Sequence, residues 1–437
     1  MGPTMVPYEF SQDIPLRHQA DVIVVGGGPG GIGAAVTAAR AGARTLLIER
    51  YGCLGGMASA GEVHPFMPNH VDGKCLDRPV YVEWVRAMRQ YLPPDAAGEP
   101  TEEVATAGDR AISKDAAMLA AEDLCLDAGV ELLYHHQLAD VVTVDSAIAA
   151  LVLFSKSRYT AAEAECYVDC TGDADLAARA GCEIELGGPT GHCQPMTLCF
   201  KLAGIDRERL PSRGEISRLY DEAKARGEID CPREDVLIFD WLRDDVLHFN
   251  TTRVVHKLGT DGVELSAAEV EARRQLREYL AFFRKHVPGF EGCWVYSVAH
   301  HIGVRETRRV RGRAYLTRDD FVAARKFPDA VARVRYNIDI HNPDGTGTEH
   351  LRLPEGEWYE IPYGCLVPNG ADNLLVGGRP ISVDHAVHSS MRVMPPACSV
   401  GQAAGLAAAM AARRGCPPAE LNGVEVRRKL VKMGACL

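Results

Sequence analysis

The sequence lacks the features that would place it in a membrane, in a secretory pathway or among thiol-based redox enzymes. It has no run of about 18 apolar residues, so no membrane-spanning helix is predicted. The N-terminus has neither the basic nor the apolar segment of a signal peptide, which leads us to expect a cytoplasmic protein. The 14 cysteines occur without C-x-x-C spacing. We therefore expect mostly buried free thiols, with no disulfide framework and no zinc site.

An excess of positive charge is also missing. Lys and Arg total 48 against 59 Asp and Glu, which gives a net charge of −11. A basic face able to neutralise phosphates is therefore not expected, and nucleic acid is excluded as a partner in favour of a small-molecule substrate. The length of 437 residues exceeds what one ordinary core supports. We expect two domains or one domain with a large insertion.

The segment from Asp21 to Gly33 organises the chain. Residues 21–25 form a β-branched run typical of a buried parallel strand, and the glycines that follow open a helix. In this pattern Gly26 makes the tight turn, Gly28 lets a pyrophosphate approach the backbone, and Gly31 lets helix and strand pack closely. A second strand ends in Glu49, where an acid is expected to bind a ribose hydroxyl. The pattern predicts a dinucleotide site in an α/β fold.

The next segments continue the α/β pattern. We expect Ser113 to cap a helix that Gly129 ends, followed by a parallel strand over residues 130–134. Residues 139–168 alternate as a β-meander. The strand that follows runs into Thr171-Gly172-Asp173, which we expect to be a second ligand-facing strand end.

Six segments resemble those of the FAD-dependent oxidoreductases with a single Rossmann domain of the glutathione-reductase type. They are VGGGPGG (25–31), GCLGGMAS (52–59), VDCTGD (168–173), NLLVGGR (373–379), HSSMRVM (388–394) and GQAAG (401–405). The resemblance implies a Rossmann-like FAD-binding domain, a parallel sheet with a β-meander crossover, joined to an inserted α+β substrate domain. It places the FAD-binding domain at residues 20–75, 112–186 and 365–437. The substrate or cap domain would be residues 76–111 and 187–364.

The same resemblance implies FAD as the cofactor. The residues it assigns to FAD are Gly26, Gly28, Pro29, Gly30, Gly31, Glu49, Arg50, Gly55, Gly56, Met57, Leu138, Thr171, Gly172, Asp173, Gly378, Arg379, Gly401, Gln402, Ala403, Ala404 and Gly405. We expect the last five at the N-terminus of a helix that begins after Val400. The amides and positive dipole end of such a helix would stabilise an anionic reduced flavin.

Candidate catalytic residues lie in two regions. His388 and Arg392 stand between two segments assigned to the flavin, and His385 shares this stretch. Arg305 and His341 belong to segments that recur in the resembled family, consistent with a wall opposite the flavin. An imidazole would move a proton and an arginine would bind an anionic group. We expect Glu306 and Arg308 to form a salt bridge without a role in chemistry.

A metal site is the alternative interpretation of the histidines. His300, His301, His341, His385 and His388 lack the spacing of known zinc ligand sets, so no metal is expected.

No second G-x-G-x-x-G follows residue 180, so a separate nicotinamide domain is not expected. The sequence predicts an FAD-dependent oxidoreductase that transfers a hydride between flavin N5 and a small anionic substrate. A flavin-dependent monooxygenase is the alternative, and a protein with purely structural FAD is a third hypothesis. The direction of the reaction, the electron acceptor or donor and homo-oligomerisation stay open.

Overall fold

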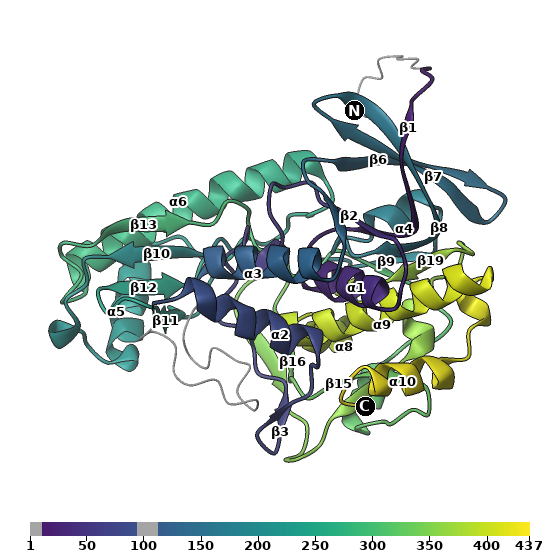
Figure 1. Cartoon of the computed structure of the whole chain (residues 1–437). Helices are drawn as coiled ribbons and strands as arrows, with labels where there is room; N and C mark the ends of the chain where they lie inside the picture. The colour runs from purple at the N-terminus through teal and green to yellow at the C-terminus, as the bar shows by residue number, and fades with distance from the viewer. Residues whose placement is uncertain (1–10, 94–111) are drawn as a thin grey trace.

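The computed structural model describes residues 11–93 and 112–437 (Figure 1). Residues 94–111, which the sequence analysis assigns to the cap domain, lie outside these ranges. The helices are α1 (Pro29–Arg40), α2 (Val80–Ala87), α3 (Lys114–Asp127), α4 (Asp175–Arg179), α5 (Arg213–Ala225), α6 (Gly262–His286), α7 (Arg318–Val322), α8 (His385–Met391), α9 (Met394–Arg414) and α10 (Gly423–Lys432). The strands of the first half are β1 (Leu16–Val25), β2 (Thr45–Ile48), β3 (His70–Val71), β4 (Lys74–Cys75), β5 (Glu131–Leu133), β6 (Gln137–Val144), β7 (Ala147–Ser155), β8 (Arg158–Asp169), β9 (Ile184–Leu186) and β10 (Phe200–Ala203). Those of the second half are β11 (Ile238–Asp240), β12 (Val246–Phe249), β13 (Trp294–Val298), β14 (Arg308–Val310), β15 (Ala330–Val334), β16 (Ile338–His341), β17 (Thr348–Leu351), β18 (Tyr359–Pro362) and β19 (Leu374–Val376).

A seven-stranded sheet carries the first glycine-rich turn at its carboxyl edge. Its order is β5-β2-β1-β8-β7-β6, with β19 beside β8. Strands β5, β2, β1, β8 and β19 are parallel, and β6, β7 and β8 form an antiparallel meander. The central strand β1 is apolar and fully buried at residues 22–24, as expected for a strand covered on both faces. The predicted α/β fold, with its parallel sheet and β-meander, is confirmed.

The helices beside this sheet explain how the turn is held. In Figure 1, α1, α2, α3 and α9 lie side by side, and α1 packs most extensively against α9.

The N-cap prediction for α3 is confirmed, because the Ser113 hydroxyl accepts a hydrogen bond of 3.3 Å from the Ala116 amide.

Helix α9 begins earlier than predicted. Its first residue is Met394, and Pro395 follows within the first turn. Proline suits this position because its missing N–H would have no partner inside the helix. The predicted start after Val400 is therefore wrong, and Gly401 lies about two turns inside the helix.

A second, antiparallel sheet has the order β11-β12-β10-β13 and is covered by α5 and α6 (Figure 1). Its core is rich in aromatic side chains, among them Phe200, Phe249, Tyr279 and Phe283. Not all of the predicted cap residues pack in this second core. Val331 in β15 and Ile361 in β18 belong to the core of the large sheet, because β15 packs against α9.

All 14 cysteines are free thiols, and most are buried, as predicted. Among the described residues, no helix combines the length and the apolar composition needed to cross a membrane.

Candidate functional site

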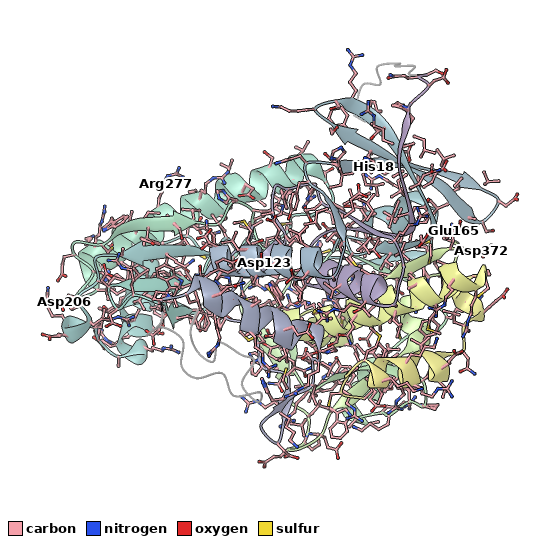
Figure 2. All side chains as sticks on the ribbon, viewed as in Figure 1. His18, Asp123, Glu165, Asp206, Arg277 and Asp372 are labelled. Atoms are coloured by element: carbon pink, nitrogen blue, oxygen red, sulfur yellow. The ribbon has the colours of Figure 1, made fainter. Side chains whose placement is uncertain are left out.

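A cavity of about 640 Å³ separates the carboxyl edge of the large sheet from a wall built by the later segments. On the sheet side it is lined by residues that follow β1, β2, β8 and β19, namely Gly26, Glu49, Thr171 and Gly378. The opposite wall includes Arg233, Phe239, Arg305, Asp339, His341 and Arg392. Outside the cavity, charged side chains such as Asp206 and Arg277 project from the surface (Figure 2).

The turn after β1 leaves room for a ligand against the backbone. Gly26 has φ +99°, and a Cβ there would stand 2.4 Å from the Cys170 carbonyl oxygen, so the tight turn requires glycine. Gly28 differs, because a Cβ there would meet only Gly56 Cα, at 3.9 Å. Gly28 lines the cavity and is the N-cap of α1. The open backbone and the free amides of a helix N-terminus suit a pyrophosphate.

Glu49 is fixed at the end of β2. Its Oε2 accepts a hydrogen bond of 2.6 Å from the Gly27 amide, and its Oε1 accepts one of 2.9 Å from Tyr51. Burial raises the pKa of the Glu49 carboxyl, while these amides oppose the shift. Each carboxylate oxygen retains a lone pair, so the group can still accept a bond from a ribose hydroxyl. With Gly28 and Gly56, this arrangement fits the dinucleotide expected from the sequence.

Arg379 ties the Thr171-Gly172-Asp173 turn to the opposite wall. It donates to the Gly172 carbonyl at 2.7 Å and to Asp173 Oδ1 at 2.6 Å, and it also donates to the Val304 carbonyl. Arg379 thus holds one side of the cavity against the other at the point where β8 and β19 end.

Arg305 and Arg392 bring two positive charges to the opposite wall. Arg305 donates to the Pro195 carbonyl at 2.8 Å and to Thr197 Oγ1 at 2.5 Å. Arg392 donates to Gln194 Oε1 and to the Asp339 carbonyl, both at 3.2 Å. In the described part of the chain, neither guanidinium has a carboxylate as hydrogen-bond partner.

The electrostatics of this wall favour an anion. Burial lowers the pKa of both arginines, and the charge of Arg392 lowers that of Arg305 further. The carboxylate of Asp339 opposes both shifts, but it supplies one negative charge against two arginines. An anion bound beside the guanidinium groups would offset the remaining cost of their desolvation.

His341 and Asp339 form a pair beside the arginines. His341 Nε2 lies 3.5 Å from Asp339 Oδ2, and Arg253 lies 3.1 Å from His341 Nδ1. An arginine can only donate, so Nδ1 is the acceptor and the neutral ring carries its proton on Nε2. Burial lowers the pKa of His341. Burial opposes ionisation of Asp339, but the hydrogen bond from His341 and the arginine charges outweigh it and lower the pKa of that carboxyl.

Two predicted catalytic histidines do not line the cavity. His388 is fully buried in α8, and neither ring nitrogen has a partner among the described residues. His385 Nδ1 lies 2.8 Å from Glu306 Oε1. The expectation that His388 lies in the substrate pocket is therefore wrong, because the first turns of α8 point these rings into the protein.

The predicted partner of Glu306 is also wrong. Arg309 donates to Glu306 Oε1 at 2.5 Å, whereas Arg308 donates to Asp175 Oδ1 at 3.0 Å. Alternation along β14 turns these two neighbouring arginines to opposite sides.

Most residues assigned to FAD line the cavity. Those that do so are Gly26, Gly28, Pro29, Gly30, Glu49, Arg50, Gly56, Met57, Leu138, Thr171, Gly172, Asp173, Gly378 and Arg379. Those that lie outside its lining are Gly31, Gly55, Gly401, Gln402, Ala403, Ala404 and Gly405.

The Gly401 segment serves helix packing instead. A Cβ at Gly405 would stand 2.0 Å from the Ala34 carbonyl oxygen in α1, so α9 needs glycine there to approach α1. Gln402 accepts from the Val80 amide at 3.3 Å and donates to the Arg78 carbonyl at 3.0 Å, which fixes the start of α2. The part of α9 that faces the cavity is its first turn, with Met394 and Ala397.

Sequence reasoning missed several residues of the wall. Arg233 is buried and lines the cavity, and its Nη1 has no partner among the described residues. Asp339 lies two residues before His341 in the sequence I-D-I-H, which the sequence analysis had already assigned to the wall. In a strand these two side chains lie on the same face, and this alternation could have identified Asp339. Arg233 follows no pattern in the sequence that would have marked it.

A comparison with known protein families matches most of the chain. A family model described as FAD dependent oxidoreductase matches residues 21–430. Dihydrolipoyl dehydrogenase from Trypanosoma brucei brucei is 49% identical over 47 residues, which are 11% of this chain. The match covers only 10% of that enzyme.

Solved structures resemble the chain at low identity. A geranylgeranyl bacteriochlorophyll reductase-like protein from Thermoplasma acidophilum is 12% identical with a TM-score of 0.42, covering 95% of this chain and 83% of the other. The p-nitrophenol 4-monooxygenase from Pseudomonas putida DLL-E4 is 11% identical with a TM-score of 0.46, covering 96% and 87%. The flavin-dependent brominase Bmp2 is 10% identical with a TM-score of 0.47, covering 95% and 83%.

Proposed function

Because the chain belongs to the family of FAD dependent oxidoreductases, we propose that it oxidises or reduces a small organic anion in the cavity between the large sheet and the arginine-bearing wall. The cofactor of this enzyme is FAD. When bound, FAD accepts or donates a hydride at N5, which is the chemistry that the proposal requires.

We assign the binding of FAD to residues 20–75, 112–186 and 365–437, and the substrate side to residues 76–111 and 187–364. Arg392 is the exception, because it lies in the third FAD segment and faces the substrate side of the cavity. The support for the first assignment is the open backbone at Gly28, the amide-held carboxylate of Glu49 and the helix N-terminus between them. Gly28 and Gly56 would hold the pyrophosphate, since both line the cavity. A Cβ at Gly56 would stand 2.8 Å from Gly28 Cα, so the two glycines pack against each other and the pyrophosphate would lie beside the pair. Glu49 would accept a bond from the adenosine ribose.

The observation that carries the proposal is the pair Arg305 and Arg392. Both line the cavity, and their hydrogen bonds go to neutral oxygens only. A carboxylate of the substrate would bind across the two guanidinium groups, which would orient the substrate and neutralise the wall. Charge-assisted bonds of this kind give both affinity and a fixed geometry, and a fixed geometry is what hydride transfer needs.

His341 and Asp339 are the groups that would hold the proton of the reaction. Asp339 stays ionised beside the proton on His341 Nε2, so its carboxylate is the group of this pair that would accept a proton leaving the substrate. The charges of Arg305 and Arg392 make it a weak base in the substrate-free enzyme, and an anionic substrate that neutralises those charges would make it a stronger one. His341 is held by Arg253 and cannot rotate without losing that bond. The pair replaces His388 as the acid–base candidate, since His388 does not line the cavity.

The test is rapid-mixing absorbance spectroscopy of the flavin against a panel of small carboxylates and their neutral amides. We expect wild-type protein to react with a carboxylate and not with its amide. Replacing both arginines, as Arg305→Gln and Arg392→Gln, should weaken substrate binding at least about tenfold, since each charged hydrogen bond contributes about 1.5–3 kcal/mol. Asp339→Asn should retain FAD and slow the reaction about 10²–10⁴-fold.

Two results would contradict the proposal. Carboxylates that bind the double variant as tightly as the wild type would remove the arginines from substrate binding. Incorporation of labelled oxygen from O₂ into the product would show that the chain is a monooxygenase instead.

A further inference from the structure

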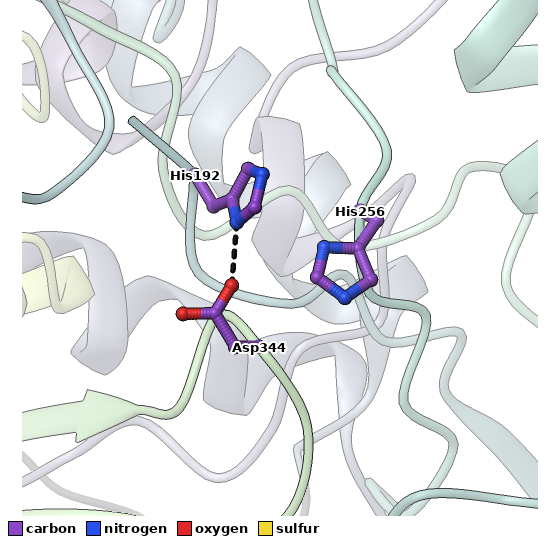
Figure 3. A group of neighbouring side chains, drawn as sticks. All are labelled: His192, His256 and Asp344. Carbon is purple, nitrogen blue, oxygen red and sulfur yellow. Dashed lines mark hydrogen bonds and ion pairs between the residues drawn. The ribbon is translucent and has the colours of Figure 1, made fainter. Parts of the chain in front are cut away.

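Three loops bring His192, His256 and Asp344 together outside the cavity lining (Figure 3). Their ligand atoms, two imidazole nitrogens and one carboxylate oxygen, all lie within 4.8 Å of one another. His192 Nδ1 lies 2.5 Å from Asp344 Oδ1, and the rings of His192 and His256 have centroids 4.8 Å apart. Within residues 11–93 and 112–437, no other three His, Cys, Asp or Glu side chains form such a group.

We propose that these three side chains bind a divalent transition-metal ion of the zinc type, with water completing the coordination. Two imidazoles and a carboxylate form a ligand set that zinc accepts, and imidazole also suits nickel and copper. The sequence analysis weighed other histidines for a metal. The sequence analysis did not consider His192 and His256 because they are distant in the chain and follow no ligand spacing.

The present geometry is close to what such an ion needs. Metal–ligand bonds of about 2.0–2.2 Å place the ligand atoms of a tetrahedral site roughly 3.3–3.6 Å apart. All three side chains are exposed, so the rings can turn without disturbing the core. The metal would take the place of the hydrogen bond between His192 and Asp344.

The loops that carry these ligands already contact the arginine-bearing wall. Gln194, close to His192, accepts hydrogen bonds from Arg392 and from the His341 amide, both at 3.2 Å. Arg253, close to His256, donates to the Gly345 and Gly347 carbonyls beside Asp344, at 3.0 and 3.1 Å. A metal at this site would join the three loops and hold this part of the wall in place.

The test is calorimetric titration of the FAD-loaded full chain with Zn²⁺, after removal of metals and of any affinity tag. We expect one Zn²⁺ to bind per chain at this site and to raise the melting temperature. His192→Ala, His256→Ala and Asp344→Asn should each raise the Zn²⁺ dissociation constant at least about tenfold, because ligand groups contribute at least as much as their supporting partners. Their FAD content should equal that of the wild type, which shows that the variants are folded.

Two variants serve as controls. His300→Ala removes an exposed histidine outside the group, and Cys193→Ser removes the thiol beside His192; both should bind Zn²⁺ as the wild type does. Wild-type protein without saturable Zn²⁺ binding, or ligand variants with unchanged affinity, would overturn the proposal. Loss of binding in Cys193→Ser alone would also overturn it, since that result identifies a thiolate site. None of these measurements involves the substrate, so their outcome is separate from that of the proposed reaction.

Discussion

Gly401 in α9 lies directly against Gly30 in α1: a Cβ atom on Gly401 would stand 1.9 Å from the Gly30 carbonyl oxygen. The two helices can approach this closely only because glycine has no side chain at the contact. Gly30 also lines the cavity, so the contact fixes the position of the α1 N-terminus. The packing of α9 thereby determines where the pyrophosphate of FAD can bind.

We therefore expect Gly401→Ala to destabilise the protein by at least about 1–3 kcal/mol, the usual cost of overpacking, and to lower its FAD content. Urea denaturation and flavin absorbance would measure the two effects. Gly262→Ala is the matched control, since Gly262 opens α6 and a Cβ there meets nothing within 4 Å. Equal stability of the Gly401 and Gly262 variants would contradict the packing argument.

Gly28→Val tests whether the pyrophosphate of FAD binds against the backbone at Gly28. The added side chain meets no protein atom closer than 3.9 Å at its Cβ, so the variant should fold. Its methyl groups would occupy the space expected for the pyrophosphate, and we expect flavin absorbance to be lost from the purified protein. Gly292→Val adds the same side chain at an exposed glycine with open space around it and should keep FAD. If the purified Gly28→Val variant keeps its flavin absorbance, the pyrophosphate does not bind at Gly28.

Local patterns were enough to predict the sheet and the glycine-rich edge. The strand before Gly26, the acid at Glu49 and the turn at Thr171 follow from hydrophobic runs and from residue types that permit only a few backbone conformations. The same reasoning placed the start of α9 too late, because the small residues of the Gly401 segment are as typical of close helix packing as of a helix end. The prolines at 395 and 396 carried the correct signal.

The substrate side could not be predicted as well, because its residues come from distant segments. Arg305 and Arg392 were singled out from their segments, but their shared lack of a carboxylate partner is a property of the folded chain. The burial of His388 is likewise determined by how α8 packs, and the residue spacing of such a short helix does not indicate which of its faces is buried.

The buried position of His388 predicts an effect of pH on stability. Burial, followed by the charges of Arg309 and Arg392, lowers the pKa of His388 well below its ordinary value of about 6.5. Below that ordinary value the unfolded chain binds a proton that the folded chain does not, so this residue makes the fold less stable as the pH falls. His388→Leu should reduce the loss of unfolding free energy between pH 6.5 and pH 5.5 by up to about 1.4 kcal/mol.

Urea denaturation at several pH values would measure this difference, with His300→Leu, at an exposed residue, as the control. The His388 variant should also keep FAD and react with substrate at a rate close to that of the wild type. A loss of rate of 100-fold or more, with FAD retained, would show that His388 takes part in the reaction despite its burial.

The two arginine environments predict effects of opposite sign on the stability of the substrate-free enzyme. Desolvation and the charges of neighbouring arginines outweigh the attraction of Asp339 for Arg305, so Arg305→Met removes an unfavourable charge and should raise the free energy of unfolding by about 0.5–2 kcal/mol. Arg309 is more deeply buried than Arg305 and is paired with Glu306 at 2.5 Å. Arg309→Met leaves that carboxylate with one partner fewer and should lower the free energy of unfolding by about 3–5 kcal/mol.

Urea denaturation of both variants, without and with a saturating carboxylate substrate, gives the comparison. Substrate should stabilise the wild type more than the Arg305 variant, because the bound anion interacts favourably with the charge of Arg305. An Arg305 variant less stable than the wild type in the absence of substrate would show that its charge serves the fold.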